Sequence, residues 1–258
     1  MTAAGRAEID ATPSETVTDA PDAQGAVLHA DFSGKGQIRA VIFDSDGTLV
    51  DSEILSALVV VEMVAEQGIT MDAEEALHRF RGCEFAKFLA KLAQDTGLTE
   101  LDAFTQAFRE RSKARYAVEL QAMPNAVSLV RQLQVPKSVA SNGPRDKLDV
   151  CLRAAGLIDY FPRDRIFSAY EVGAWKPDPA LVLHAANAMG VAPSQCLLVE
   201  DSVAGIEAGL AAGVHVVGYR LEDDVKAGLS RPVPVIQDML EVLEWLAPDA
   251  QNAAPSPR

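Results

Sequence analysis

The pattern of apolar and polar positions divides the chain into stretches of different character. Residues 1–36 show no sustained periodicity and are rich in Ala, Asp, Thr, Pro and Gly, which predicts a mostly disordered leader. A short apolar run lies at 39–43, and its length and β-branched residues are typical of a buried strand. This run stops abruptly at two acidic residues and a glycine. Beyond them the pattern is first purely helical and then alternates between strand and helix.

The stretch 53–123 has the purely helical pattern. Apolar residues recur at helical spacing in four segments, at 53–67, 72–80, 85–96 and 101–120. The third segment carries four apolar side chains on one face: Phe85, Phe88, Leu89 and Leu92. We interpret this stripe as packing surface rather than as a cofactor-binding face. Because the stretch contains no convincing strand, we expect an all-helical domain inserted directly after the first strand.

From Pro124 onward, strands and helices alternate. Strands are expected at 137–141, 165–169, 196–199, 214–218 and 233–236. Helices are expected at 126–133, 146–155, 179–189, 202–212 and 239–246. This alternation predicts an α/β fold, with a doubly wound, mostly parallel Rossmann-like sheet and helices on both faces. The predicted core is discontinuous, formed by 37–52 and 124–247, with a helical cap at 53–123 and a loose tail at 248–258.

Composition and charge narrow the functional classes. The apolar fraction of 48% and the charged fraction of 23% are ordinary for a soluble globular protein. The formal net charge of −14 argues against non-specific nucleic-acid binding, which needs a basic surface. No apolar run approaches the roughly 18 residues that span a bilayer. Residues 1–22 also lack the basic and apolar regions of a signal peptide. We therefore expect a cytoplasmic protein with neither nucleic-acid nor membrane partners.

The cysteines indicate neither a metal site nor a disulfide framework. Cys83, Cys151 and Cys196 are widely scattered, odd in number, and match no metal-ligand spacing. Reduced thiols in the cytosol are the default for such a set. The sequence leaves the oligomeric state open, and a monomer is plausible.

Two carboxylates end the first predicted strand. Asp44 and Asp46 are one residue apart at the end of 39–43, so they project to different sides and cannot both fill the core. Ligands of α/β sheets bind beyond the carboxyl ends of parallel strands. Both aspartates are therefore candidate site residues, although Asp-x-Asp-Gly alone is also common in turns.

The strand at 137–141 brings a second polar group to the same edge. It ends in Ser141, a hydroxyl donor, followed by Asn142 and Gly143, whose backbone N–H groups can face an anion. Taken alone, Ser-Asn-Gly is a common loop tripeptide.

Further charged groups are expected beside these. Glu200 and Asp201 follow the strand at 196–199 and begin a helix, where acids also occur simply because the helix dipole favours them. Lys176 lies in the proline-flanked segment 175–179, and most lysines are solvated surface residues. The order of the four motifs, three of them following a predicted strand, favours a shared site over four unrelated loops.

Together these groups suit phosphoryl transfer. Carboxylates at strand ends can hold Mg²⁺, which takes oxygen ligands and keeps water molecules for a substrate phosphate. A lysine supplies positive charge for phosphate oxygens and for a carboxylate nucleophile. One carboxylate can attack phosphorus and form an acyl phosphate, while a second protonates the leaving oxygen and then deprotonates water.

The motifs resemble those of the haloacid dehalogenase-like (HAD) superfamily over about 38–246. The matching segments are 44–48 (Asp-Ser-Asp-Gly-Thr), 141–143 (Ser-Asn-Gly), 176–179 (Lys-Pro-Asp-Pro) and 200–205 (Glu-Asp-Ser-Val-Ala-Gly). The helical insertion is similar to the cap of the β-phosphoglucomutase-like branch. Within that branch, the segment 167–181 is most similar to bacterial 6-phosphogluconate phosphatases.

This resemblance implies a role for each matched residue. Asp44 would be the nucleophile and a Mg²⁺ ligand, and Asp46 the general acid/base that also offers the metal its backbone carbonyl. Asp201 would complete the metal site, with Glu200 as a ligand or as an acid behind it. The phosphate-binding and cap residues implied by the resemblance are Ser141, Asn142 and Lys176 for the phosphoryl group, and Arg81 and Gly82 for substrate contact from the cap.

Two departures bear on the reaction. Dehalogenases of the superfamily lack the second carboxylate, so Asp46 argues against carbon–halogen chemistry. β-Phosphoglucomutase has a histidine early in its first cap helix, where this chain has Ser56. We therefore expect a Mg²⁺-dependent phosphatase that hydrolyses a small phosphorylated metabolite, such as a sugar or sugar-acid phosphate, through an aspartyl-phosphate intermediate. The alternative is a β-phosphoglucomutase-like phosphomutase.

Overall fold

The computed structural model describes residues 30–80 and 85–251 and contains a six-stranded sheet in which all strands are parallel. The strand order is β3-β2-β1-β4-β5-β6. The strands are β1 (Ala40–Phe43), β2 (Lys137–Ser141), β3 (Ile166–Ser168), β4 (Cys196–Glu200), β5 (His215–Tyr219) and β6 (Val235–Ile236). The predicted α/β fold with a doubly wound parallel sheet is confirmed.

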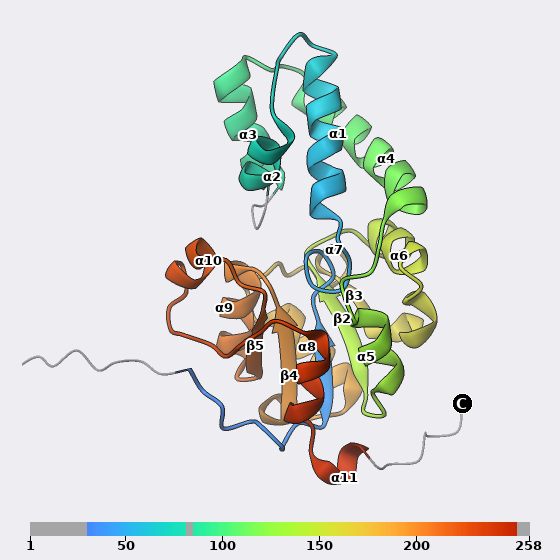
Figure 1. The fold of residues 1–258 in the computed structure, drawn as a ribbon, viewed down its shortest axis with the longest axis vertical. Coiled ribbons are helices and arrows are strands. Elements are labelled where there is room, and N and C mark those ends of the chain that lie inside the picture. Colours follow the sequence, from blue (N-terminus) through green and yellow to red (C-terminus); the bar gives the residue numbers. More distant parts are fainter. Residues whose placement is uncertain (1–29, 81–84, 252–258) are drawn as a thin grey trace, which may run out of the picture.

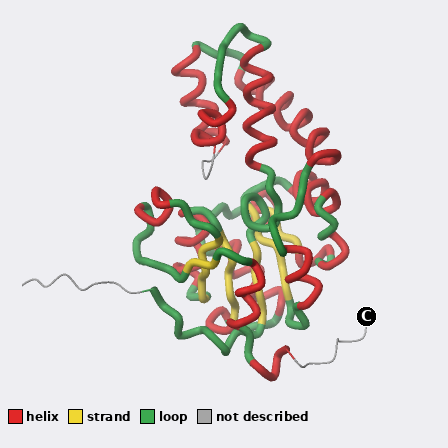
Figure 2. The backbone as a smooth tube through the Cα atoms, in the orientation of Figure 1, coloured by secondary structure: helices red, strands yellow, loops and turns green. Residues whose placement is uncertain are grey.

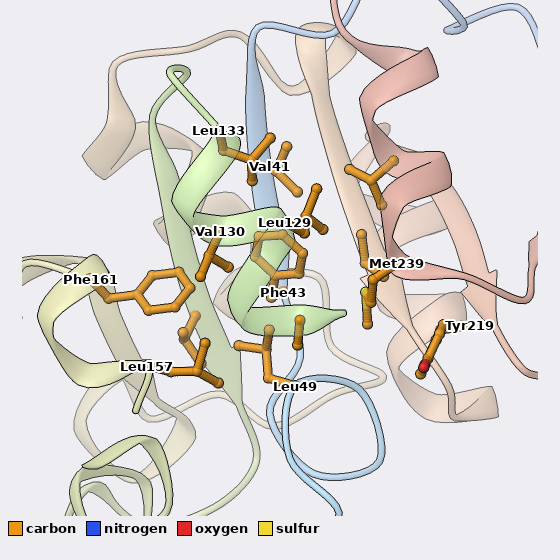
Figure 3. Packing of buried hydrophobic residues seen from close by; sticks show 14 of the residues in the cluster. Val41, Phe43, Leu49, Leu129, Val130, Leu133, Leu157, Phe161, Tyr219 and Met239 are labelled. Atoms are coloured by element: carbon orange, nitrogen blue, oxygen red, sulfur yellow. The ribbon is translucent and has the colours of Figure 1, made fainter. Parts of the chain in front are cut away.

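Helices cover both faces of this sheet (Figure 1). They include α5 (Ala126–Gln132), α6 (Arg145–Ala154), α8 (Ala180–Met189), α9 (Val203–Ala212) and the 3₁₀ helix η4 (Met239–Trp245). Side chains of a strand alternate between faces, so β1 contributes to two cores. Val41 and Phe43 pack into the core beneath α5 and η4, which Figure 3 shows, whereas Ala40 and Ile42 pack into the core beneath α8 and α9. Burial on both faces explains why this strand is uniformly apolar.

Between β1 and β2 the chain forms a helical segment with its own core. Its helices are α1 (Glu53–Ala65), α2 (Ala73–Phe80), α3 (Phe85–Thr96) and α4 (Leu101–Glu119). The third buried cluster of the molecule lies entirely within this segment. Phe85 stacks on Phe108 with ring centroids 4.4 Å apart, and Phe88, Leu89 and Leu92 are buried. The apolar stripe at 85–96 is therefore packing surface, as we interpreted it.

The helical segment stands beyond the end of β1, where the predicted carboxylates lie (Figures 1 and 2). The chain enters it through 44–52 and leaves it through 120–125. These two connections are hydrogen-bonded to each other, because Asp51 N donates to Gln121 O (3.1 Å) and Met123 N donates to Leu49 O (2.9 Å). The two connections between the helical segment and the sheet therefore run side by side and are hydrogen-bonded to each other.

The two ends of the described chain differ from the prediction. Residues 1–29 of the expected disordered leader lie outside the described residues, but Phe32 stacks on Trp245 and Gly36 N donates to Trp245 O. The tail was expected to be loose from residue 248, yet it begins with the helix α11 (Pro248–Gln251), and Asp249 forms an ion pair with Arg39 (2.6 Å). Contacts with distant residues thus hold parts of 30–36 and 248–251, where local periodicity is missing, and the expected limits of leader and tail stay predictions.

Several short elements also escaped prediction. They are α7 (Ala169–Val172), α10 (Asp223–Ala227) and the 3₁₀ turns η1 (Ile158–Tyr160), η2 (Arg163–Arg165) and η3 (Pro193–Gln195). Each is five residues or fewer, too short to show a helical repeat. None of the helices in the described part of the chain is both long and apolar enough to cross a membrane.

Candidate active site

The loop after β1 is folded back on itself and presses against the end of β4. Asp44 N continues the ladder by donating to Val199 O (3.0 Å), after which Leu49 N and Val50 N both donate to Ser45 O. Gly47 has a φ of +78°, and a Cβ atom there would overlap the carboxylate of Asp201. Glycine is therefore required at this position both for the backbone conformation and for the close approach of the two loops.

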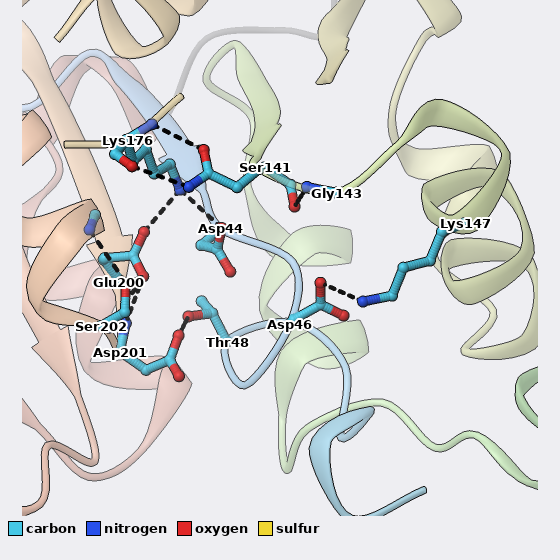
Figure 4. A network of polar contacts seen from close by, with 12 residues as sticks. Asp44, Asp46, Thr48, Ser141, Gly143, Lys147, Lys176, Glu200, Asp201 and Ser202 are labelled. Atoms are coloured by element: carbon cyan, nitrogen blue, oxygen red, sulfur yellow. Dashed lines mark hydrogen bonds and ion pairs between the residues drawn. The ribbon is translucent and has the colours of Figure 1, made fainter. Parts of the chain in front are cut away.

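Lys176 joins two of the predicted carboxylates. Its Nζ lies 2.7 Å from Asp44 Oδ1 and 2.7 Å from Glu200 Oε2, and only 2% of its side chain is exposed (Figure 4). The Asn142 side chain holds the lysine backbone, since Lys176 N donates to Asn142 Oδ1 (2.8 Å) and Asn142 Nδ2 donates to Lys176 O (3.1 Å). This contact connects the loop that carries the lysine to the end of β2.

Glu200 and Asp201 are held by different partners. Glu200 Oε1 accepts hydrogen bonds from Asp201 N, Ser202 N and Ser202 Oγ, while its Oε2 accepts from Lys176. A Cβ atom at Gly205 would overlap this carboxylate, so the first turn of α9 leaves space for it. Thr48 Oγ1 donates to Asp201 Oδ1 (2.8 Å).

One oxygen from each of Asp44, Glu200 and Asp201 lies within 4.8 Å of the others. Hydrogen bonds reach both carboxylate oxygens of Glu200, Oδ1 of Asp44 and Oδ1 of Asp201. Among the described residues, no hydrogen bond reaches the two remaining oxygens of the cluster, Asp44 Oδ2 and Asp201 Oδ2. Burial, then the negative charge of Glu200, raises the pKa of Asp44 to about 8, although Lys176 opposes the shift. Burial and the charges of Glu200 and Asp44 likewise raise the pKa of Asp201 well above its ordinary value. Such an excess of buried carboxylates fits a hard divalent cation bound through oxygen.

Asp46 has a separate environment. Ser52 Oγ donates to its Oδ1, and Lys147 Nζ lies 2.8 Å from its Oδ2 (Figure 4). Burial alone would raise the pKa of Asp46, but the Lys147 ammonium and the hydrogen bonds from Lys147 and Ser52 hold it below its ordinary value. No backbone hydrogen bond among the described residues uses the Asp46 carbonyl oxygen. The two aspartates of the loop therefore differ in partner and in proton affinity.

Ser141 lies between these two environments. Its Oγ accepts from Gly143 N (3.1 Å). A Cβ atom on Gly143 would lie 3.4 Å from Ser141 Oγ and 3.8 Å from Asp46 Oδ2. The absence of a side chain at Gly143 thus leaves open the space that the serine hydroxyl and the Asp46 carboxylate both border.

The structure brings most of the predicted residues to one edge of the sheet. Asp44, Lys176 and Glu200 are buried and form one cluster with the half-buried Asp201, with Ser141 and Asn142 beside it. The Asn142 side chain faces the Lys176 backbone, which leaves the Asn142 backbone N–H, as expected, as the group that can meet an anion. Arg81 and Gly82 lie outside the described residues.

Sequence reasoning missed three residues that contact the predicted set: Thr48, Ser52 and Lys147. Thr48 lies inside the first motif and was quoted without a role. Lys147 lies six residues beyond Ser141 in the first turn of α6. A lysine on the first turn after a motif strand was the available signal, since that turn starts at the same sheet edge.

Comparison with known proteins gives the family. The family described as haloacid dehalogenase-like hydrolase matches residues 38–213. The chain is 40% identical over 181 residues to 6-phosphogluconate phosphatase of Escherichia coli K12, covering 70% of this chain and 81% of that protein. It is 30% identical over 187 residues to a fructose-1-phosphate phosphatase of the same organism, covering 70% and 96% of the two chains.

A solved structure agrees with this match. The HAD family hydrolase of Deinococcus radiodurans R1, solved with bound phosphate and sodium, superimposes with a TM-score of 0.69 at 34% identity. The comparison covers 86% of this chain and 100% of the other. Together with the motifs and the parallel sheet, these matches confirm the resemblance inferred from the sequence: the chain belongs to the haloacid dehalogenase-like hydrolase family.

Proposed function

We propose that the protein is a Mg²⁺-dependent phosphatase that hydrolyses a small phosphorylated metabolite, a sugar or sugar-acid phosphate. The observation that carries this proposal is the buried cluster of Asp44, Lys176 and Asp201, with a second carboxylate, Asp46, held apart from it. Relatives named as phosphatases of 6-phosphogluconate, fructose 1-phosphate and hexitol phosphates support the substrate class.

In the first step the Asp44 carboxylate attacks phosphorus. A bond forms between its oxygen and phosphorus, and the bond from phosphorus to the substrate alcohol oxygen breaks. Asp46, as a carboxylic acid, gives its proton to that oxygen, so the alcohol leaves neutral. Lys176 offsets the charge of Asp44 and of the phosphoryl oxygens.

In the second step water attacks the phosphorus of the aspartyl phosphate. Asp46, now ionised, accepts a proton from this water, and the bond between phosphorus and the Asp44 oxygen breaks. Inorganic phosphate leaves, and both carboxyl groups return to their starting states. The Lys147 ammonium and the Ser52 hydroxyl favour the ionised form of Asp46, which is the form that accepts this proton, and the accepted proton makes Asp46 the acid of the next cycle.

The metal would be held by the Asp44 and Asp201 carboxylates and the Asp46 backbone carbonyl, with Glu200 behind them. When bound, Mg²⁺ supplies positive charge to the attacking carboxylate and to the phosphate oxygens. Thr48 keeps Asp201 oriented, and Gly47 allows the Asp46 loop to reach it. Glu200 fixes Lys176 and the turn at 201–202 rather than offering a free oxygen.

Phosphate binding is assigned to Ser141, to Lys176 and to the backbone N–H of Asn142. The helical segment, with proposed limits 53–123, would act as a cap that excludes water during the reaction. Arg81 and Gly82 are proposed to contact the substrate from this cap. The site then takes a small molecule rather than a folded phosphoprotein.

The alternative of a phosphomutase is less well supported. The β-phosphoglucomutase that the chain resembles has a histidine where this chain has Ser56. The Ser56 side chain is buried, donates to Ser52 O (2.8 Å) and is hydrogen-bonded to the Tyr116 hydroxyl. It is therefore engaged in packing the base of α1.

A phosphate-release screen tests the proposal. We expect Mg²⁺-dependent release from at least one sugar or sugar-acid phosphate, with 6-phosphogluconate as the first substrate. Asp44→Asn should abolish release while leaving the circular dichroism spectrum unchanged. Turnover by this variant, or wild-type release that depends on a bisphosphate activator, would contradict the assignment.

A further inference from the structure

Lys147 is the second lysine of the site, and no motif accounts for it. It lies in the first turn of α6, and its Nζ lies 2.8 Å from Asp46 Oδ2. The two side chains are 23% and 26% exposed, so solvent screens this ion pair less than one on the open surface. Lys176, by contrast, serves Asp44 and Glu200. Each aspartate of the first motif thus has its own ammonium group.

The lysine is itself supported by an aromatic ring. Its Nζ lies 5.7 Å from the ring centroid of Tyr116 on α4, within the range of a cation–π contact. Tyr116 is 1% exposed, so its ring is fixed by the surrounding core. The ion pair with Asp46 and the contact with the Tyr116 ring together hold the Lys147 ammonium in one position.

The other oxygen of Asp46 is held through the base of α1. Ser52 Oγ donates to Asp46 Oδ1, and Ser56 Oγ donates to Ser52 O (2.8 Å). Because the Ser56 hydroxyl proton is used in that bond, the Tyr116 hydroxyl donates to Ser56 Oγ. These contacts form a closed network that joins the loop after β1 to α1, α4 and α6. Its five members are Asp46, Lys147, Tyr116, Ser56 and Ser52.

This network of five residues fixes the orientation of the Asp46 carboxylate. Both of its oxygens have a partner, and Figure 4 shows the side chain directed toward Lys147 rather than toward Lys176 and Glu200. Its Oδ2 also borders the open space beside Gly143 and Ser141. A carboxylate held at this border faces a substrate bound at Ser141, whereas one free to rotate would spend time elsewhere.

We propose that Lys147 is a positioning residue for Asp46, holding the acid/base carboxylate at the edge of the phosphoryl site, with the Tyr116 ring as its support. The inference rests on the proposed function, in which Asp46 carries the proton. Proton transfer depends on a donor–acceptor distance within hydrogen-bond reach, so loss of the holding group lowers its rate.

The test compares two leaving groups in wild-type enzyme and Lys147→Met. The first probe is the alkyl phosphate that the wild-type enzyme hydrolyses fastest, whose alcohol must be protonated as it leaves. The second is p-nitrophenyl phosphate, whose phenolate leaves without a proton. General acid catalysis contributes about 10²–10⁴-fold, so we expect kcat/KM on the alkyl phosphate, which covers the steps up to departure of the alcohol, to fall by at least about tenfold. The kcat/KM on p-nitrophenyl phosphate should change by less than about threefold, because its leaving group needs no proton. Hydrolysis of the aspartyl phosphate is common to both probes and does not enter kcat/KM.

Two further variants separate positioning from a structural role. Lys147→Arg keeps the charge and should recover most of the kcat/KM on the alkyl phosphate. Lys113→Met is the matched control, because it removes the neighbouring ion pair between α4 and α6 (Lys113 Nζ to Asp146 Oδ2, 2.6 Å) without touching Asp46. It should leave the ratio of the two kcat/KM values unchanged.

The outcomes distinguish the inference from the proposed function. If Lys147→Met lowers kcat/KM equally on both probes, lowers it on neither, or raises it on the alkyl phosphate, the positioning role is refuted while the phosphatase assignment stands. If Lys147→Met is too unstable to assay, the same comparison on Lys147→Gln decides the question. A wild-type enzyme that releases phosphate from neither probe would overturn the proposed function and the inference with it.

Discussion

Mg²⁺ binding should depend steeply on pH, because the metal and protons compete for the same buried carboxylates. Burial and the neighbouring Glu200 raise the pKa of Asp44 to about 8, and the pKa of Asp201 is raised in the same direction. Raised pKa values mean that the folded protein without metal binds protons that the unfolded chain does not bind between about pH 4 and pH 8. Its stability therefore falls as the pH rises through this window. Mg²⁺ needs the ionised form and displaces these protons.

The magnitude can be worked from the pKa of Asp44. With one displaced proton and a pKa of about 8, protonation weakens the apparent affinity about 100-fold at pH 6 and about twofold at pH 8. The dissociation constant of Mg²⁺ should therefore be about 50-fold larger at pH 6 than at pH 8, which corresponds to about 2 kcal/mol of binding free energy. A second proton on Asp201 would increase this difference.

Isothermal titration calorimetry in the absence of substrate measures the effect directly. We expect tighter binding at pH 8 than at pH 6. Net proton release, measured in buffers of different ionisation enthalpy, should fall from about one proton per Mg²⁺ at pH 6 to about half a proton at pH 8. Asp201→Asn should weaken binding strongly. Asp46→Asn is the matched control and should bind Mg²⁺ nearly as the wild type does, because its side chain lies outside the cluster. Equal affinity at both pH values, or unchanged binding by Asp201→Asn, would refute the reasoning.

Three further outcomes are expected from the same contacts. Lys176→Met leaves two carboxylates buried without their ammonium partner, so we expect urea titration to show a loss of about 3–5 kcal/mol of unfolding free energy in metal-free buffer. Gly47→Ala should lose Mg²⁺ affinity by calorimetry, because the added Cβ atom would overlap the Asp201 carboxylate. Gly68→Ala is the control, since Gly68 has a similar positive φ but no atom near its Cβ position, and this variant should lose only stability. Equal Mg²⁺ affinity in the two variants would contradict the requirement for close approach at Gly47. Burial raises the pKa of the Cys151 thiol to about 12 and that of Cys196 to about 11, so a disulfide reagent at pH 8 should modify neither until urea is added; modification of either in the native protein would show that its burial is incomplete.

The strand ends were predictable because each is a local signal. The apolar run before Asp44, the turn at Gly47 and the acids before α9 are all encoded within a few neighbouring residues, and parallel pairing brings them to one edge. The contact between Lys147 and Asp46 spans 101 residues, so the position of Lys147 on the first turn after a motif strand indicates the sheet edge but not the partner. It exists because α6 begins at the strand end next to β1.

Other features of the structure also depend on information that the local sequence does not contain. The Asn142 side chain pairs with the backbone N–H and C=O of Lys176, 34 residues away in the sequence, and the position of that segment is set by tertiary structure. The last helix was predicted from its apolar repeat, and the structure has a 3₁₀ helix there, Met239–Trp245, because the repeat does not distinguish the two helix types. The contacts of Phe32 and Asp249 are equally non-local.

The hydrogen-bonded pairing of the two connections to the helical segment, 44–52 and 120–125, has a consequence for how such proteins diversify. Leu49 bonds to Met123 and Asp51 to Gln121, so the helical segment leaves and re-enters the sheet domain at neighbouring points. A segment with adjacent ends and its own core can be exchanged for another without disturbing the strands on either side. Grafting 53–119 from a relative with a different substrate should therefore transfer selectivity while the catalytic cluster keeps its geometry. The paired connections therefore predict that the chemistry of the site and the choice of substrate can change independently of each other.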